Sequence, residues 1–330
     1  MRERARNERK INGVLSKYDH PFVVKMAHAF STDKCLCLAL ELLPCGELFQ
    51  LAKDHDPGSY QGKTRGKRFP EKAARFYVAE CVVALEFVHD RAVLYRDLKP
   101  ENVLVNVDGH VKISDFGLSK PNVSEPLRGA SSMCGTPEYL SPEILNEATN
   151  HVHGLAVDWW ACGALLFELL AGKPPWYAEN RKKLFDKIAR TPLKLPTVSP
   201  KLSADGVALL RALLEKDPAK RLGSASGRAA DVKHHRFFAM VDFDALLDKK
   251  IEPPFRPKFS AFTDDALDKS LAWTNVDAPD PPRRLDVTPD RFDDIFKYWD
   301  STVPATKATA TQDNKDNDDG RASRRQPARV

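Results

Sequence analysis

The feature that most constrains the fold is a polar segment, Tyr95–Asn102, enclosed between two apolar runs. Its sequence, YRDLKPEN, follows Ala92–Leu94 and precedes Val103–Val105. Its aspartate, lysine, glutamate and asparagine lose hydration when buried, and hydrogen bonds must offset that loss. We therefore expect these side chains to meet at one site, held between two strand-like segments.

A second polar group follows shortly afterwards in the chain. Val103–Val105 and Val111–Ile113 flank an Asp-Gly pair, a pattern that predicts a β-hairpin. Asp115-Phe-Gly comes directly after the second strand of this hairpin. The hairpin is therefore expected to bring Asp115 back beside Tyr95–Asn102.

These residue types suit phosphoryl transfer. The reaction needs a metal ion against the developing charge, a cation on the phosphate and a carboxylate that accepts the hydroxyl proton. Asn102 and Asp115 carry the oxygen donors that Mg²⁺ prefers. Lys99 is placed to contact the transferred phosphate, and Asp97 is then the candidate general base.

The remaining pattern predicts an α+β fold. An apolar run, Cys35–Leu42, predicts a buried strand that leaves through Pro44–Gly46, and Lys53–Arg68 is expected to be a surface insertion. Apolar periodicity predicts helices over residues 70–88, 156–171, 181–190 and 203–216, the last with Ser203 as its N-cap. Residues 304–330 lack large apolar side chains and are expected to be disordered.

Charge and hydropathy exclude several classes of protein. The chain of 330 residues has a net charge of +5. Residues 1–10 carry five Arg/Lys against two Glu, and residues 304–330 carry six against four Asp, so the body between them is neutral. We therefore expect no nucleic-acid partner. No apolar run reaches membrane-spanning length and no secretory signal is visible, so a cytoplasmic protein with reduced cysteines is expected.

Four ordered motifs resemble a known family. YRDLKPEN, DFGLSK, CGTPEYLSPE and DWW are similar to the catalytic domain of eukaryotic serine/threonine protein kinases. Tyr95, the CGTPEYL sequence and Pro253-Pro-Phe255 resemble the AGC group, which includes cyclic-AMP-dependent kinase and relatives of the ribosomal S6 kinases. The resemblance extends from about residue 5 to about residue 300.

The resemblance implies a bilobal protein-kinase-like fold with a truncated small β-rich lobe, a large helical lobe and a C-terminal extension. Its expected boundaries are 1–238 for the kinase domain with a hinge near 41–46, 239–303 for the AGC-type tail, and 304–330 for the disordered tail.

The resemblance also assigns roles at the active site. Asp97 is similar to the catalytic base, Lys99 to the phosphate-contacting lysine, and Asn102 and Asp115 to the Mg²⁺ ligands. The implied ATP-binding set is Leu40 (gatekeeper), Glu41 and Leu43 (adenine hinge), Glu47 (ribose), Glu101, Asn102, Asp115 and Phe292.

Other positions match substrate-binding, regulatory and structural sites of the family. Glu47, Glu101 and Asp186 match acidic positions that favour arginine upstream of the phosphorylated serine or threonine; the alternative is solvated surface carboxylates. Ser132 matches the phosphosite of an upstream activating kinase, where a phosphate would pair with Arg96. Glu143 and Arg221 match a buried ion pair with a structural role.

The Gly-rich turn and the strand lysine that grip the ATP phosphates in this family do not occur. Glu8 is a candidate for the glutamate that would pair with that lysine. The expected function is a serine/threonine kinase acting near basic residues, whose sequence here is a truncated gene model or fragment. The alternative is a catalytically impaired fragment or pseudokinase that acts as a binding scaffold.

Overall fold

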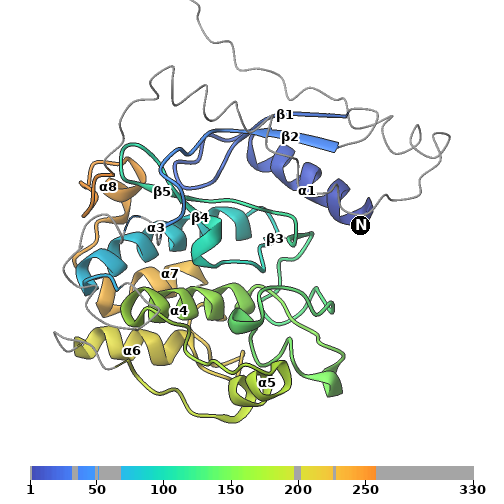
Figure 1. The fold of residues 1–330 in the computed structure, drawn as a ribbon, viewed down its shortest axis with the longest axis vertical. Coiled ribbons are helices and arrows are strands. Elements are labelled where there is room, and N and C mark those ends of the chain that lie inside the picture. Colours follow the sequence, from blue (N-terminus) through green and yellow to red (C-terminus); the bar gives the residue numbers. More distant parts are fainter. Residues whose placement is uncertain are drawn as a thin grey trace, which may run out of the picture.

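A computed structural model describes residues 2–31, 36–48, 51, 68–196, 202–225 and 228–257. Most of the expected insertion, Phe292, the tail beyond residue 257 and the expected disordered segment 304–330 lie outside these described residues. A small lobe of one helix and two strands lies above a larger helical lobe (Figure 1). This arrangement confirms the expected α+β fold, with a small lobe that contains strands and a large helical lobe.

The small lobe is one helix packed on a two-stranded sheet. Helix α1 (Arg2–Leu15) contacts strand β1 (Met26–Ser31), which pairs antiparallel with β2 (Leu36–Leu40). Ile11 and Leu15 on α1 are buried and join the main core, so the helix is anchored to the large lobe as well as to the sheet.

The sequence predicted a buried strand within Cys35–Leu42; the strand is present as β2, but its expected burial is wrong. The side chains of β2 are half-buried or exposed, and Leu40 at its end is 42% exposed. Within the described residues, α1 covers one face of the β1–β2 sheet, where Ala5 of α1 and Leu36 and Leu38 of β2 pack against the buried Met26 and Ala29. An apolar run predicts a strand buried on both faces, but composition does not reveal how many faces of the sheet are covered.

The hairpin that the sequence predicted is present, and it is bonded to the chain below the small lobe. Strands β4 (Val103–Val105) and β5 (Val111–Ile113) pair antiparallel, with Val103 opposite Ile113. The amide of Val24 donates to the carbonyl of Ile113 at 3.0 Å, and the amide of Ile113 donates to the carbonyl of Phe22 at 2.9 Å. The chain below the small lobe is thereby tied to the hairpin that carries the polar segments.

A second short strand pair closes the same region. Strand β3 (Val93–Leu94) pairs antiparallel with β6 (Lys120–Pro121). The polar segment leaves β3, forms a 3-10 turn, η1 (Pro100–Asn102), and enters β4. Both polar segments therefore have their ends fixed by strands.

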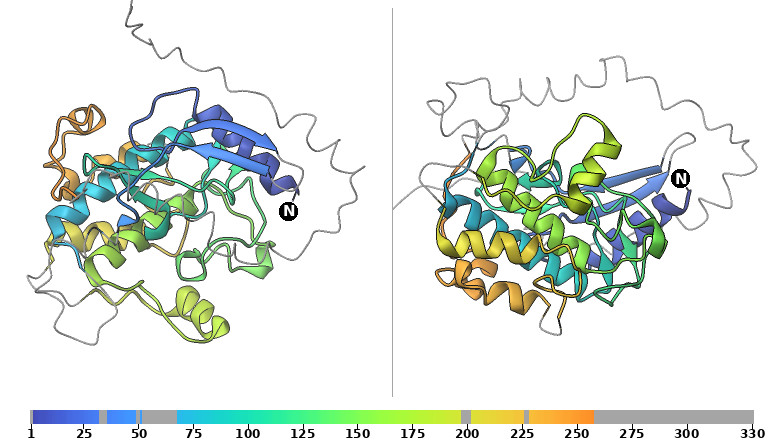
Figure 2. Two further views of the ribbon diagram at one scale, coloured as in Figure 1. Left: turned by 45° about the horizontal axis from the view of Figure 1, so that its top comes forward. Right: turned by 90° about the horizontal axis from the view of Figure 1, so that it is seen from below.

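The large lobe is built around two apolar helices, α3 and α4, which pack against each other (Figure 2). Its helices are α3 (Glu71–His89), α4 (Ala156–Ala171), α5 (Arg181–Arg190), α6 (Ala204–Leu213), α7 (Ala229–Lys233) and α8 (Phe243–Leu247), with 3-10 turns η2 (Pro137–Tyr139), η3 (Glu147–Thr149) and η4 (Arg236–Phe238). Almost every residue of α4 is buried, as its sequence predicted. The indole rings of Trp160 and Trp176 stack at 5.3 Å and extend this core toward α5.

Local capping sets the helix ends. The Ser203 hydroxyl accepts a hydrogen bond from the amide of Gly206 at 3.0 Å, which confirms Ser203 as the N-cap of α6. Helix α6 ends at Leu213, three residues before the predicted Lys216. The Glu215 carbonyl accepts from Arg221 Nε at 2.9 Å, so this part of the chain is used for a tertiary contact.

A buried polar pair links α3 to the hairpin. Glu80 lies on α3 with no exposed surface, and its carboxylate accepts from the amide of Val111 at 2.9 Å and contacts His110 Nδ1 at 2.5 Å. Burial raises the pKa of Glu80 to about 7, against the hydrogen bonds from His110 and Val111, which lower it.

We predict that Glu80→Ala destabilises the fold by about 3 kcal/mol or more, because it leaves the His110 imidazole and the Val111 amide without their partner in the core. Urea unfolding measures this change. Lys220→Ala removes an exposed pair with Asp217 and should shift stability by less than about 0.5 kcal/mol. Equal effects of the two substitutions would contradict a structural role for Glu80.

Candidate active site

The polar segment is fixed by one buried carboxylate on α4. Asp158 has no exposed surface. It accepts from the amide of Tyr95 at 2.9 Å and the amide of Arg96 at 2.7 Å, and lies 2.7 Å from His89 Nε2. Arg96 adopts φ +70°, a conformation that L residues rarely adopt without external support. Asp158 supplies that support and so determines where the next residue, Asp97, points.

Asp97 lies at the centre of a hydrogen-bonded cluster. Its carboxylate accepts from Asn102 Nδ2 at 2.9 Å and from the Thr136 hydroxyl at 2.9 Å, and pairs with Lys99 Nζ at 3.0 Å. Lys99 Nζ also donates to the Thr136 hydroxyl at 3.0 Å. The sequence-predicted base and phosphate-contacting lysine therefore lie together, and Asp97 is only 5% exposed.

Asp115 comes back beside this cluster, as the hairpin predicted. The amide of Ser114 donates to the Asn102 carbonyl at 2.9 Å, and its hydroxyl donates to the same carbonyl at 3.1 Å. Asp115 itself is exposed and accepts from the Gly117 amide at 3.0 Å through Oδ1.

The oxygen atoms of Asn102 and Asp115 fit a Mg²⁺ ion. Asn102 uses its Nδ2 to bind Asp97, which leaves Oδ1 as an acceptor, and Asp115 retains Oδ2. No group of three or more His, Cys, Asp or Glu suited to a metal occurs among the described residues. Such a sparse set suits Mg²⁺, which takes one or two carboxylates and completes its shell with water and substrate phosphates.

Glu8 on α1 lies close to Asp115. Burial and the negative charge of Asp115 both raise the pKa of Glu8. A Cβ on Gly117 would lie 3.0 Å from Asp115 Oδ1 and 3.5 Å from Glu8 Oε2. Helix α1 therefore brings an acidic side chain from the small lobe to the edge of the Asp97 cluster.

The expected nucleotide-binding residues of the hinge have different environments. Leu43 is buried, whereas Leu40 is exposed. The Glu41 carboxylate is bonded to Lys112 Nζ at 2.7 Å and accepts from the Lys25 amide at 2.8 Å. Glu41 therefore joins the hinge to β5 through its side chain.

The expected phosphosite faces the expected arginine. Arg96 Nη1 donates to the Ser132 hydroxyl at 2.8 Å, and Arg96 Nε donates to the Leu118 carbonyl at 2.7 Å. The guanidinium is thus already held between the segment after Asp115 and the loop that carries Ser132. Arg4 on α1 lies near enough to lower the pKa of Arg96, although burial is the larger cause.

The predicted pairing of Glu143 and Arg221 is present. Arg221 Nη1 and Nη2 bind the two Glu143 oxygens at 2.6 and 2.9 Å, and Nη1 also donates to the Ala156 carbonyl at 2.9 Å. The Arg221 side chain is fully buried beneath the N-terminus of α4. The pair therefore holds the helix that carries Asp158.

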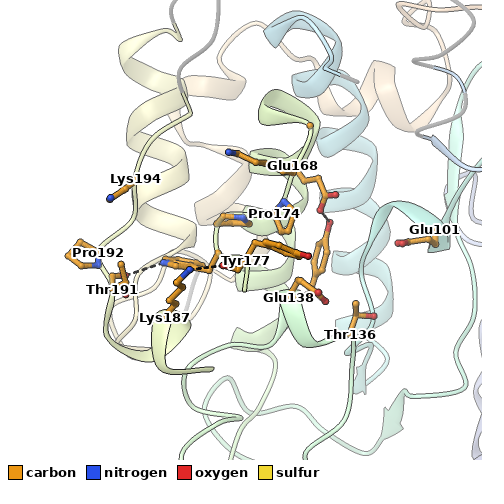
Figure 3. Close-up of a pocket in the computed structure, with 15 residues that line it drawn as sticks. Glu101, Thr136, Glu138, Glu168, Pro174, Tyr177, Lys187, Thr191, Pro192 and Lys194 are labelled. Atoms are coloured by element: carbon orange, nitrogen blue, oxygen red, sulfur yellow. Dashed lines mark hydrogen bonds between the residues drawn. The ribbon is translucent and has the colours of Figure 1, made fainter. Parts of the chain in front are cut away.

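A pocket of about 750 Å³ opens beside the Asp97 cluster (Figure 3). Thr136, Glu101, Glu138 and Glu168 lie along one side of it. Burial is the main cause that raises the pKa of Glu168, and the charges of Glu101 and Glu138 raise it further. The hydrogen bond from the Tyr139 hydroxyl lowers the pKa without cancelling these effects. Three carboxylates thus share one pocket, and within the described residues none of them forms an ion pair.

The sequence grouped the acidic residues differently. Of Glu47, Glu101 and Asp186, only Glu101 lines the pocket; Glu47 is exposed beside β4, and Asp186 is exposed on α5. The structure therefore does not bring these three residues to the same pocket, and their role as a set stays a prediction.

Sequence reasoning missed Thr136, Asp158, Glu138 and Glu168 as individual site residues. A signal existed for Asp158 and Glu168, because each is an acidic residue within the otherwise apolar helix α4. A charge in a helix that is buried all round needs a partner. No comparable signal marks Thr136, whose bond to Asp97 spans 39 positions of the chain.

We predict that Glu143→Ala destabilises the fold by roughly 3–5 kcal/mol, because it leaves the buried Arg221 guanidinium unpaired. Thermal unfolding measures the loss. Glu147→Ala, at an exposed neighbouring position, is the matched control and should leave stability within about 0.5 kcal/mol. A stable Glu143→Ala variant would contradict a structural role for the pair.

Comparison with known proteins agrees with this geometry. The sequence matches the protein kinase domain family over residues 1–238. It is 38% identical to RAC-beta serine/threonine-protein kinase of Homo sapiens over 281 residues, covering 83% of this chain and 53% of the human protein. It is 41% identical to Protein kinase 2 of Dictyostelium discoideum over 251 residues, covering 76% of this chain and 48% of that protein.

A further relative is Protein kinase 3 of Dictyostelium discoideum, 39% identical over 252 residues, which cover 74% of this chain and 26% of that protein. The chain therefore spans between about a quarter and about half the length of these relatives. Among the described residues, no helix is long and apolar enough to cross a membrane. The chain belongs to the protein kinase domain family, and its relatives place it with the AGC group of serine/threonine kinases.

Proposed function

We propose that the protein transfers the γ-phosphoryl group of ATP to serine and threonine hydroxyls of protein substrates, in contexts that contain arginine. Membership of the kinase family implies ATP and Mg²⁺ in general. The observation that carries the proposal is the position of the Asp97 carboxylate, bonded to Thr136, Lys99 and Asn102 beside Asp115.

In the proposed reaction, the substrate hydroxyl oxygen forms a bond to the γ-phosphorus while the bond between that phosphorus and the ADP oxygen breaks. Asp97 orients the hydroxyl and accepts its proton. Lys99 places a positive charge beside the transferred phosphate, and Thr136 holds both side chains in position. Asn102 and Asp115 would hold Mg²⁺, which supplies charge neutralisation when it is bound. For the nucleotide itself, Leu40, Glu41, Leu43, Glu47 and Phe292 remain proposed contacts.

The acidic side of the pocket supports the preference for arginine. Glu101, Glu138 and Glu168 line the same pocket as Thr136, whose hydroxyl binds the proposed base (Figure 3). Bringing a guanidinium among them would relieve their mutual repulsion and form charge-assisted hydrogen bonds. A substrate arginine near the phosphorylated residue would therefore be favoured.

We further propose that an upstream kinase phosphorylates Ser132. Its hydroxyl already contacts Arg96, so a phosphate there would gain charge-assisted hydrogen bonds and order the loop that leads to Thr136. The covalent change would thus act directly on the position of a residue that binds Asp97.

We propose residues 1–238 as the catalytic domain and 239–303 as a C-terminal extension that packs back onto it, with 304–330 as a tail. The described part of the extension supports this division. The rings of Phe255 and Phe69 lie 5.7 Å apart, and Lys249 pairs with Asp108 at 2.9 Å.

A cytoplasmic setting is also proposed. Cys81 and Cys162 are both buried thiols. Burial is the main cause that raises the pKa of Cys81, and the nearby Cys162 raises it further. Neighbouring thiols that stay reduced suit a reducing compartment.

We predict that Asp97→Asn lowers kcat for an arginine-containing peptide by about 10²–10⁴-fold, because the amide cannot accept the hydroxyl proton. The rate is measured by phosphate transfer from labelled ATP to the peptide, using the purified full gene product. Asp90→Asn makes the same change at an exposed position and should retain the wild-type rate. Equal turnover by Asp97→Asn would reject Asp97 as the base.

We predict that Glu168→Gln raises KM for the arginine peptide about 10-fold, with little effect on a matched peptide that has alanine in place of arginine. The raised pKa of Glu168 adds a pH dependence: as pH falls toward that pKa, the carboxylate gains a proton and loses its attraction for arginine. Wild-type KM for the arginine peptide should therefore rise at acidic pH.

Glu168→Gln should remove this part of the pH profile, because the variant is neutral at every pH. Glu179→Gln, an exposed position outside the pocket, is the control and should keep the wild-type profile. An unchanged preference for the arginine peptide in Glu168→Gln would show that the pocket does not read arginine.

A further inference from the structure

The neutral sum of charge over the body of the chain hides a strongly basic segment. Between Lys173 and Lys194 there are seven Lys/Arg against two Asp/Glu, a local net charge of +5. This equals the net charge of the whole chain, so all other residues together sum to zero. The segment comprises nearly all of the α4–α5 connection, α5 itself and the residues that follow it up to Lys194.

Three of these cations line the same pocket as the glutamates. Lys173, Lys187 and Lys194 contribute to its wall. Figure 3 shows Lys187 and Lys194 on the side opposite Glu138 and Glu168. The pocket therefore has an acidic end beside the Asp97 cluster and a basic end near α5, formed by Lys187 and Lys194.

The basic end is held by a fixed frame. Lys187 Nζ donates to the Tyr177 carbonyl at 2.8 Å, which uses one of its three donors. The Thr191 carbonyl, just before Lys194, accepts from Trp176 Nε1 at 3.1 Å and Lys216 Nζ at 2.8 Å. The α4–α5 connection and the segment that follows α5 are thus hydrogen-bonded to each other and to the rest of the large lobe.

Within the described residues, none of the three pocket lysines forms an ion pair. Other lysines do: Lys112, Lys233 and Lys249 each pair with a carboxylate within 3 Å. Unpaired ammonium groups around one concavity repel each other, and an anionic ligand would relieve that repulsion.

We propose that the basic end of the pocket docks an acidic segment of the protein substrate, rich in Asp and Glu, while the acidic end holds the substrate arginine. This inference rests on the proposed kinase activity and narrows its substrate class to peptides with a basic residue near the phosphorylated hydroxyl and an acidic segment beyond the basic residue. The two opposite charges at the two ends fix the direction in which a substrate can lie.

A basic helix also suits an anionic membrane surface, but α5 does not have the matching apolar face. Leu184 and Ile188 are its buried apolar residues, and both pack into the core of the large lobe. Interfacial helices need such side chains for insertion into lipid. A peptide lying across the pocket uses the lysines without requiring an apolar face on the helix.

The test compares three peptides that share the same serine and arginine. Their tails beyond the arginine are Glu-rich, neutral or Lys-rich. We expect kcat/KM to be about 5- to 10-fold higher for the Glu-rich peptide than for the neutral one, mainly through KM. The gain should shrink as salt rises from 50 to about 300 mM, because exposed charges are screened.

The double variant Lys187→Glu/Lys194→Glu should reduce the ratio of kcat/KM for the Glu-rich peptide to that for the neutral peptide to about one or below. Lys182→Glu is the matched control on α5, outside the pocket, and should keep the wild-type ratio. A wild-type ratio of one, a preference for the Lys-rich tail, or a ratio that survives the double variant would each overturn the proposal.

A binding measurement separates this proposal from the kinase activity. Fluorescein-labelled copies of the peptides, with alanine in place of the serine, are titrated with protein and followed by anisotropy. Tighter binding of the Glu-rich copy, lost in the double variant, supports the docking site even if no peptide is phosphorylated. Equal binding of the Glu-rich and neutral copies rejects an acidic peptide as the preferred occupant. Displacement of the Glu-rich copy by phosphatidylserine vesicles, added at the same total negative charge as the peptide, rejects it as well.

Discussion

The buried carboxylate of Asp158 is the contact on which the site depends. It satisfies the amides of Tyr95 and Arg96, which stand at the start of the polar segment, and the ring nitrogen of His89 at the end of α3. An amide buried without a partner is costly, so the chain has one favourable path past this point. That path sets the position of Asp97, and the bonds from Asn102 and Thr136 then fix its carboxylate.

The same helix organises the pocket. Asp158 lies in the first turn of α4 and Glu168 ten positions later, which corresponds to about 15 Å along the helix axis. Because α4 is buried almost all round, it is a rigid element, and it fixes the positions of both carboxylates. The reaction centre and the surface that would receive the substrate arginine are therefore held in a fixed relation, and Arg221 and Glu143 brace the N-terminus of this helix.

The sequence predicted the site where its signals were local. The polar segment between apolar runs located Asp97, Lys99 and Asn102, and a hairpin pattern was sufficient to bring Asp115 back to them. Contacts between distant segments carried no such signal. The bond between Thr136 and Asp97 depends on how a long loop crosses the large lobe, and Asp186 turned out to be on the exposed face of α5. The exposure of β2 was likewise unpredictable, because an apolar run does not reveal whether one or two faces of its sheet are covered.

The positions of the charges in this molecule matter more than its net charge. A body of neutral net charge contains a pocket with carboxylates at one end and lysines at the other, so composition alone gave no indication of either. Such separation favours a ligand with opposite charges in a fixed order, and it penalises the reverse order by placing like charges together. The geometry thereby specifies an orientation as well as an attraction.

The role of Asp158 is tested by amide hydrogen exchange at Tyr95 and Arg96, measured together with the rate of phosphoryl transfer in wild type and Asp158→Asn. If Asp158 holds the polar segment in place, both amides exchange slowly in the wild type. In the variant they exchange faster by about 100-fold while the amides of α3 stay protected, and phosphoryl transfer is lost in parallel. Wild-type protection of both amides in Asp158→Asn, or full activity in a variant whose amides exchange freely, would contradict this role.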